Sequence, residues 1–274
     1  MADRLRVVRD GFGHYVLFVG VAFRSAWQYR TSLVLLTMAE TLATALDFAA
    51  IGIVFANVAR LRDFALAEVA FLYATSATAF ALAECVLGQL DRIGWQIRDG
   101  KMDAVLTRPV SPLVQAATSE FSPQRVGRLA QPAAVLALSL AALDLRWTPG
   151  RIILIPLMVA GGALIAGSLI VTGCAWLFVA PDASMAVAAA RQGAGLATQY
   201  PMTIYSRHLL VLLTFVVPVA FVNWQPALYV LARPDPLGLP TAARFLAPVV
   251  AALAVAGAAW AWRAGIRHYR STGS

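Results

Sequence analysis

Apolar stretches separated by short polar gaps run along most of this chain. Apolar stretches that suggest helical spans lie at residues 32–57, 65–90, 126–143, 152–179, 209–222 and 242–262, and Pro218 breaks the fifth of them. A helix needs about 20 predominantly apolar residues to cross a bilayer, and most of these stretches approach or exceed that length. The pattern therefore predicts an all-α fold, a polytopic membrane helix bundle with about six transmembrane helices.

The N-terminal residues 1–31 contain an apolar stretch, Tyr15 to Phe23, that is too short to span a membrane. Apolar residues recur there on one helical face: Phe12, Val16, Val19, Phe23 and Trp27. Residues 1–31 are therefore expected to form a cytosolic or interfacial helix that lies along the membrane surface.

Three segments between the spans have distinct compositions. Residues 91–112, here called the charged segment, are the longest charged gap, and we expect a compact cytosolic unit with one short helix ending at Gly100 and another starting at Ser111 and Pro112. The Ala/Gly-rich stretch that follows Pro181 and Asp182 and extends to Gln199 predicts a weak helix near the cytosolic surface. Residues 223–240, rich in Pro, Trp and Tyr, predict an extracellular re-entrant segment.

Composition makes lipid the solvent for much of the chain. Of its 274 residues, 60% are hydrophobic and 13% are charged, and the mean hydropathy is +0.71. This is more apolar surface than one soluble core of that length can bury. The net charge of +8 resides mainly in the short gaps, which is a topology signal rather than a nucleic-acid footprint. Membrane lipid is therefore an expected partner, and nucleic acid is not.

Basic residues indicate the orientation, because Lys and Arg are retained on the cytoplasmic side. With the N-terminus inside, 16 basic residues fall on the cytoplasmic side, Arg191 and Arg207 among them, against 6 outside. We therefore expect a multi-pass protein of the cell membrane with both termini cytoplasmic. A membrane bundle has no separate core for each half, so residues 1–274 are expected to form a single transmembrane domain.

Motifs for enzymatic chemistry are missing from the sequence. A P-loop needs a Gly-rich loop followed by Lys and Ser or Thr, and the sole lysine, Lys101, lies instead between Gly100 and Met102. The histidines are scattered, no HExxH or GxSxG motif occurs, and Cys85 and Cys174 lie apart in apolar stretches. We therefore expect no catalytic, cofactor-binding or metal-binding residues, and if ATP drives this protein, a partner subunit binds the ATP and Mg.

Polar residues recur at helical spacing inside the first two spans. The expected polar pathway consists of Thr37, Glu40, Thr44 and Asp47 in the first span and Tyr73 and Glu84 in the second. Ionisable groups in hydrocarbon cost several kcal/mol and usually mark a partner or a pathway. A structural role, bonding neighbouring helices, is the favoured interpretation, and attraction of a cationic substrate is the other.

Two ordered motifs stand out, IRDGKMDAVLTRPVSPLVQ at residues 97–115 and, between residues 200 and 231, YPMTIY followed by LTFVVPVAFVNWQPALYVL. Together with RVGR at residues 125–128 they resemble the type-2 permeases of ATP-binding-cassette (ABC) exporters. Within that class they are similar to a bacterial subfamily of multidrug-exporter-like proteins.

The resemblance implies the transmembrane subunit of an ATP-driven exporter that moves hydrophobic or cationic compounds, drugs or xenobiotics, across the bacterial inner membrane. Two copies of a cytosolic ABC ATPase would dock on it, and a second permease would complete a homodimer or heterodimer. An interface helix is implied at Phe12 to Arg30. ATPase-coupling residues are implied in the charged segment: Asp91, Arg92, Trp95, Arg98, Gly100, Lys101, Met102, Asp103, Leu106 and Arg108.

The same resemblance implies an external gate in the second motif. Its residues would be Pro218, Phe221, Asn223, Trp224 and Pro226, although Trp224-Gln225 stands where relatives tend to have an aromatic pair. Two other functions stay open. One is an ion-coupled secondary transporter that uses Glu40, Asp47 and Glu84, although the chain lacks the internal repeat of many such folds. The other is a non-transporting membrane scaffold.

Overall fold

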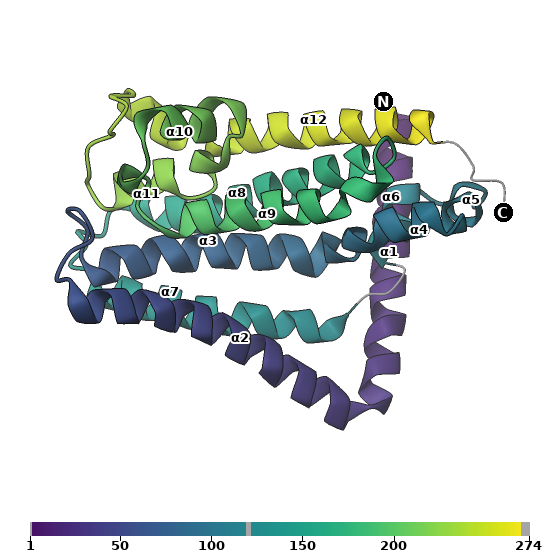
Figure 1. Ribbon diagram of the computed structural model, residues 1–274, viewed down its shortest axis with the longest axis horizontal. Coiled ribbons are helices and arrows are strands. Elements are labelled where there is room, and N and C mark those ends of the chain that lie inside the picture. Colours follow the sequence, from purple (N-terminus) through teal and green to yellow (C-terminus); the bar gives the residue numbers. More distant parts are fainter. Residues whose placement is uncertain (1, 119–121, 270–274) are drawn as a thin grey trace.

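The computed structural model describes residues 2–118 and 122–269, with all side chains in these ranges except those of residues 2–12, 89 and 91. This part of the chain is helical and contains no strand. Helices α3 (Leu66–Leu87), α7 (Gly127–Ala142), α8 (Pro149–Trp176), α9 (Ser184–Gln199) and α12 (Ala247–His268) run along the long axis of the molecule (Figure 1). Helix α2 (Arg30–Asn57) lies obliquely against α7. The expected all-α helix bundle is confirmed.

Four of the described helices, α2, α3, α8 and α12, are long and apolar enough to cross a membrane. Helices α7 and α9 have 16 residues each, which is about 24 Å at 1.5 Å per residue and short of a bilayer core of about 30 Å. Both nevertheless pack against α3, at the centre of the bundle. The expected spans at 126–143 and 152–179 correspond to α7 and α8.

One end of the bundle carries the charged segment and is called the coupling end here. Helix α1 (Ala2–Gln28) lies across this end (Figure 1), and the Tyr15 hydroxyl donates a 3.1 Å hydrogen bond to the Val86 carbonyl of α3. The charged segment follows α3 as η1 (Gly88–Arg92), α4 (Ile93–Arg98) and α5 (Lys101–Leu106), before α6 (Pro112–Thr118). Gly100 separates α4 from α5 with φ of +66°, a left-handed conformation that glycine adopts readily. The predicted end of one short helix at Gly100 and the predicted start of another at Pro112 are confirmed.

The opposite end, called the distal end here, carries a bent segment where a span broken by Pro218 is expected at 209–222. Its two halves together are long and apolar enough for a broken span or a re-entrant loop. Residues 207–230 form α10 (Arg207–Val211), the π-helical turn η5 (Leu212–Val216), η6 (Val219–Phe221) and α11 (Trp224–Val230). The two halves, Arg207–Val216 and Val219–Val230, meet at 78° next to Pro218. Proline removes a backbone donor and clashes with the preceding turn, so the helix breaks there. Arg207, expected on the cytoplasmic side, starts α10 at the distal end (Figure 1).

Helix α9 corrects the expectation of a weak helix near the cytosolic surface. It begins after η3 (Pro181–Ala183) at the coupling end and runs beside α3 towards the distal end (Figure 1). Near its other end, Thr198 Oγ1 lies 2.6 Å from Ser76 Oγ of α3. Two polar residues of α9, Arg191 and Thr198, thus contact α3 inside the bundle.

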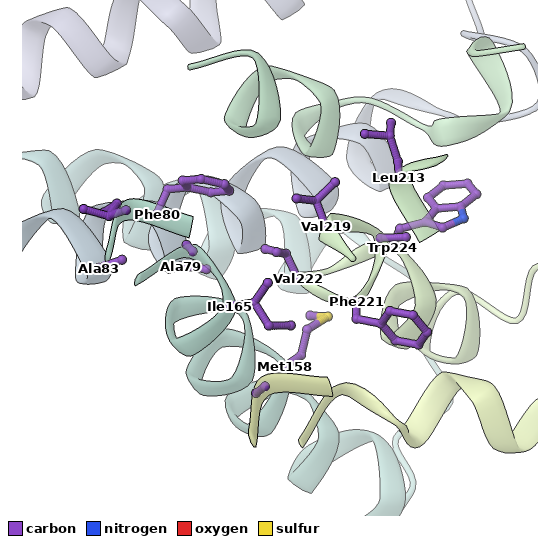
Figure 2. Close-up of a cluster of buried hydrophobic side chains, with 14 of the residues drawn as sticks. Ala79, Phe80, Ala83, Met158, Ile165, Leu213, Val219, Phe221, Val222 and Trp224 are labelled. Atoms are coloured by element: carbon purple, nitrogen blue, oxygen red, sulfur yellow. The ribbon is translucent and has the colours of Figure 1, made fainter. Parts of the chain in front are cut away.

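The core lies where the bent segment packs against α3 and α8. Figure 2 shows Val219, Phe221 and Val222 beside Met158 and Ile165 of α8. Gly162 of α8 sits at the closest approach, since an added Cβ would lie 2.6 Å from the Val222 carbonyl oxygen. The turns η2 (Pro123–Val126), η4 (Met202–Ile204) and η7 (Thr241–Phe245) complete the described elements.

Candidate functional site

A cavity of about 280 Å³ lies between α2, α3, α7 and α9 and is called the central cavity here. Its lining includes Glu40, Thr44, Asp47, Tyr73 and Glu84, five of the expected pathway residues. Thr37 does not line it, and its hydroxyl donates a 2.7 Å hydrogen bond to the Leu33 carbonyl of its own helix. The structure therefore brings the polar faces of the first two spans together, as their helical spacing predicts.

Two arginines neutralise the glutamates of the central cavity. Arg128 of α7 places Nε 2.5 Å from Glu40 Oε2 and Nη1 2.6 Å from Glu84 Oε2. Arg191 of α9 places Nη1 2.5 Å from Glu84 Oε1. One charge-balanced network thus joins α2, α3, α7 and α9, which is the helix-bonding role that the sequence favoured.

Asp47 differs from the two glutamates in the same cavity. It has no ion pair and no hydrogen bond within the described ranges 2–118 and 122–269. The ring of Tyr73 stands near it, held by Phe48 at 5.2 Å between centroids and by the Thr44 carbonyl, 3.0 Å from the Tyr73 hydroxyl. With Glu40 and Glu84 matched by Arg128 and Arg191, Asp47 leaves the cavity with one net negative charge.

The charged segment is anchored to the bundle by its apolar side. Ile93, Ile97 and Met102 are buried. Two polar contacts extend the anchorage: the Tyr269 hydroxyl donates a 2.9 Å hydrogen bond to Asp103 Oδ1, and Arg98 Nη1 lies 3.5 Å from Asp182 Oδ1. The segment is therefore fixed to the end of α12 and to the turn that leads into α9.

The outer side of the charged segment presents cationic and aromatic groups. Trp95 is 44% exposed, and Lys101 Nζ lies 3.6 Å from the centroid of its ring. Arg92, Arg98 and Arg108 are also exposed, whereas Leu106 is half-buried. The Asp91 side chain lies outside the described residues. The expected coupling residues thus divide into buried anchors and an exposed basic surface.

A family model described as "ABC-2 family transporter protein" matches residues 41–273, which include the charged segment, α7 to α9 and the bent segment. The chain belongs to the ABC-2 transporter family. It is therefore a multi-pass membrane permease, a transport subunit rather than a catalytic one. No curated protein and no solved structure matches the chain.

The expected gate residues of this ABC-2 permease are held inside the bundle. Phe221, Asn223, Trp224 and Pro226 are buried, and Pro218 is half-buried at the bend. Asn223 Nδ2 donates hydrogen bonds of 2.8 Å to the Leu72 carbonyl of α3 and of 2.8 Å to the Thr198 carbonyl of α9. Figure 2 shows Trp224 beside Leu213 at the edge of the apolar cluster. Asn223 therefore fastens the bent segment to two helices of the permease.

The most informative residues that sequence reasoning missed are Arg128 and Arg191. Both were counted as cytoplasmic topology signals, although they form ion pairs inside the bundle. The available signal was the neighbourhood in sequence: Arg191 follows Ala188-Ala189-Ala190 in an Ala-rich helix, where an arginine needs an internal carboxylate. Glu40 and Glu84, in neighbouring spans of the permease, were the available carboxylates, and Glu84 is the one that pairs with Arg191.

Proposed function

We propose that this permease is the transmembrane subunit of an ABC exporter, powered by two copies of a separate cytosolic ABC ATPase and paired with a second permease. ATP and Mg would be bound by the ATPase. The observation that supports the proposal is the position of α9, which touches the three regions an ATP-driven permease has to connect. It starts beside Asp182 at the charged segment, carries Arg191 into the central cavity and presents the Thr198 carbonyl to Asn223.

Helix α9 suggests how ATP binding would reach the transport pathway. Closure of the ATPases would press on the exposed face of α4 and α5, and the ion pair of Arg98 with Asp182 would transmit the movement to the start of α9. A shift of α9 would change the pairing of Arg191 with Glu84 and the hold of Thr198 on Asn223. The central cavity would then close towards the coupling end and open towards the distal end, as in other two-state transporters.

The central cavity supports hydrophobic or cationic compounds as cargo. Asp47 provides one uncompensated negative charge, and Phe80, Leu196 and Ala77 provide apolar lining. An organic cation would have its charge matched by the carboxylate and its apolar body covered by these side chains. Uncharged hydrophobic compounds would use the apolar part alone.

Helix α2 supports pairing with a second permease. In its most apolar 18-residue window only 6% of the residues are buried, and Leu35, Met38 and Leu42 lie exposed on it. That face would be covered by lipid or by the second permease, and the cavity that α2 borders would then lie near the dimer axis. The end of α12 and the charged segment share one end of the bundle. Docking of the ATPase from the cytoplasm would therefore put residue 269 and α1 on the cytoplasmic side of the inner membrane.

Purification of the tagged chain from its native membrane tests the ATPase partnership. Mass spectrometry should identify a P-loop ATPase in the complex, and inverted vesicles should accumulate a cationic dye such as ethidium only with ATP. Transport that survives ATP depletion and stops when the proton gradient is dissipated would show an ion-coupled transporter instead. If dye uptake is the same with and without this chain, the result would indicate a non-transporting scaffold instead.

The docking surface can be tested by charge reversal. Arg108→Glu changes an exposed residue of the charged segment, and Arg60→Glu makes the same change at an exposed residue near the distal end. The first variant should lose co-purifying ATPase or ATP-driven dye uptake, and the second should retain both. Equal behaviour of the two variants would reject the charged segment as the docking surface.

A further inference from the structure

A second hollow, separate from the central cavity, lies at the distal end and has a volume of about 330 Å³. Its lining comes from two parts of the chain: the loop between α7 and α8 with the first turn of α8, and, about 80 residues later, α11 and η7. Three arginines line it, Arg146, Arg151 and Arg244, together with the hydroxyl-bearing residues Thr148, Tyr229 and Thr241. This volume lies within the range of small-molecule sites, roughly 300–1,000 Å³.

The charge of this hollow is unbalanced. No carboxylate is among its lining residues, and none of its three arginines has an ion pair in the described part of the chain. Arg233, also at the distal end, is different because its guanidinium bonds both carboxylate oxygens of Glu68 at 2.9 Å. Three like charges around one hollow repel one another, and a bound anion would remove that cost.

The donors of the hollow are partly preorganised and partly unused. Arg151 Nη1 donates a 2.7 Å hydrogen bond to the Arg146 carbonyl, which ties the two arginines together across the start of α8. Arg244 Nε is buried and has no acceptor. A buried charged donor without a partner is costly, and such groups in folded proteins usually have a ligand or water. The Tyr229 ring supports this wall of the hollow through Phe245, at 4.8 Å between ring centroids.

The surroundings of the hollow resemble a membrane interface. Trp147, between Arg146 and Thr148, is 53% exposed, and the first residues of α8 include the exposed Ile152 and Ile153. Tryptophan is enriched at the level of lipid headgroups, with apolar residues towards the hydrocarbon. In a bilayer, we expect these arginines at the depth of the lipid phosphate groups.

We propose that Arg146, Arg151 and Arg244 form a binding site for a phosphate group, supplied either by the headgroup of an anionic phospholipid or by a free phosphate-bearing compound. Guanidinium groups bind phosphate oxygens through paired, charge-assisted hydrogen bonds. The Thr148, Tyr229 and Thr241 hydroxyls would supply neutral donors. The site does not depend on the proposed export function, because it stands apart from both the central cavity and the charged segment.

Two binding measurements on the full chain separate the sources of phosphate. In detergent, inorganic phosphate is titrated into the chain by calorimetry, and in nanodiscs of mixed phosphatidylglycerol and phosphatidylcholine the retained lipid is counted by native mass spectrometry. The variant Arg146→Gln/Arg244→Gln should bind phosphate at least about tenfold more weakly, or lose retained phosphatidylglycerol, because it removes two positive charges and their charge-assisted hydrogen bonds to the phosphate oxygens. The control Arg60→Gln/Arg62→Gln removes the same charge near the distal end and should behave as the unsubstituted chain.

Loss of phosphate binding points to a soluble ligand, and loss of lipid alone points to a headgroup; either supports the site. If neither measurement separates the two double variants, the proposal is wrong. Arginine-selective modification by phenylglyoxal provides a measurement that needs no variant. Phosphate or phosphatidylglycerol should slow modification of Arg146, Arg151 and Arg244 at least about threefold more than that of Arg60 and Arg62, and equal rates would overturn the assignment.

Discussion

Arg128 and Glu84 face each other across the centre of the bundle, with Nη1 of the arginine 2.6 Å from Oε2 of the glutamate. The second carboxylate oxygen of Glu84 lies 2.5 Å from Arg191. Glu84 is thus the shared anion of two arginines on different helices, and the side wall of the central cavity depends on it.

Replacing Glu84 by Gln should destabilise the permease, because Arg128 and Arg191 would keep their charges and lose their common partner. The pairs are partly buried, so the expected loss of unfolding free energy is about 2 kcal/mol, between the values for exposed and buried ion pairs. Thermal unfolding of the purified protein, followed by tryptophan fluorescence, measures the change. Asp47→Asn is the matched control, since Asp47 has no ion pair in the described structure, and its midpoint should move little. Equal shifts would contradict the assigned network.

Asp47→Asn should instead change the choice of cargo. Removal of the one uncompensated charge of the central cavity should lower ATP-driven uptake of a cationic dye about tenfold, or about 1.4 kcal/mol, and leave an uncharged hydrophobic dye nearly unchanged. Inverted membrane vesicles with the two dyes measure the ratio. Asp47→Glu serves as the control that keeps the charge and should retain preference for the cation. A parallel loss for both dyes would show that Asp47 only supports the fold.

Gly162→Ala should weaken the contact of α8 with the bent segment. An added Cβ at Gly162 would lie 2.6 Å from the Val222 carbonyl oxygen and 3.0 Å from the Ala79 Cβ. Neither atom belongs to a flexible chain end, so overpacking should cost about 1–3 kcal/mol. Gly257→Ala on α12 is the control, because nothing lies within 4 Å of its added Cβ. Chemical unfolding should show a lower free energy of unfolding for Gly162→Ala and an unchanged one for Gly257→Ala.

Tyr269→Phe should loosen the charged segment from α12. Desolvation and the hydrogen bond to Asp103 raise the pKa of Tyr269 to about 12, so the hydroxyl stays protonated and the bond stays intact up to about pH 10. The contact weakens only as the pH rises towards 12. Hydrogen exchange in α5, corrected for its intrinsic pH dependence, should therefore be alike at pH 7 and 9 in the unsubstituted protein and faster at both in the variant. Tyr205→Phe is the control, because it removes a hydroxyl just before α10, which lies at the distal end, away from α5. The same acceleration there would reject the link.

The sequence predicted the parts of this fold that depend on local patterns. The length of the apolar stretches predicted α2, α3, α8 and α12. Gly100 marked the end of one short helix, and Pro112 marked the start of another. Helical spacing also placed Glu40, Thr44 and Asp47 on one face. These features follow from residues within a few turns of one another.

The same reasoning misplaced α9. Helix α9 is too short and too polar to be recognised from the sequence as part of a membrane bundle. The partners of its Arg191 and Thr198 are Glu84 and Ser76 of α3, which lie more than 100 residues earlier in the chain. At residues 207–230 the sequence predicts a span broken by Pro218, and the structure has its bend there. The hydrogen bond of the Asn223 amide to the Leu72 carbonyl, which holds the second half against α3, joins residues far apart in the sequence and could not be predicted.

By itself, the sequence determined that the chain is a helical membrane protein without a nucleotide-binding motif, because hydrophobicity and short motifs are properties of neighbouring residues. Only the tertiary structure decided which charges cancel and which remain. Arg128 and Arg191 compensate Glu40 and Glu84, whereas Asp47 and the arginines of the distal hollow keep their charge. The physical reason is that electrostatic energy depends on distance in space, and these partners come together only when helices far apart in the chain pack side by side.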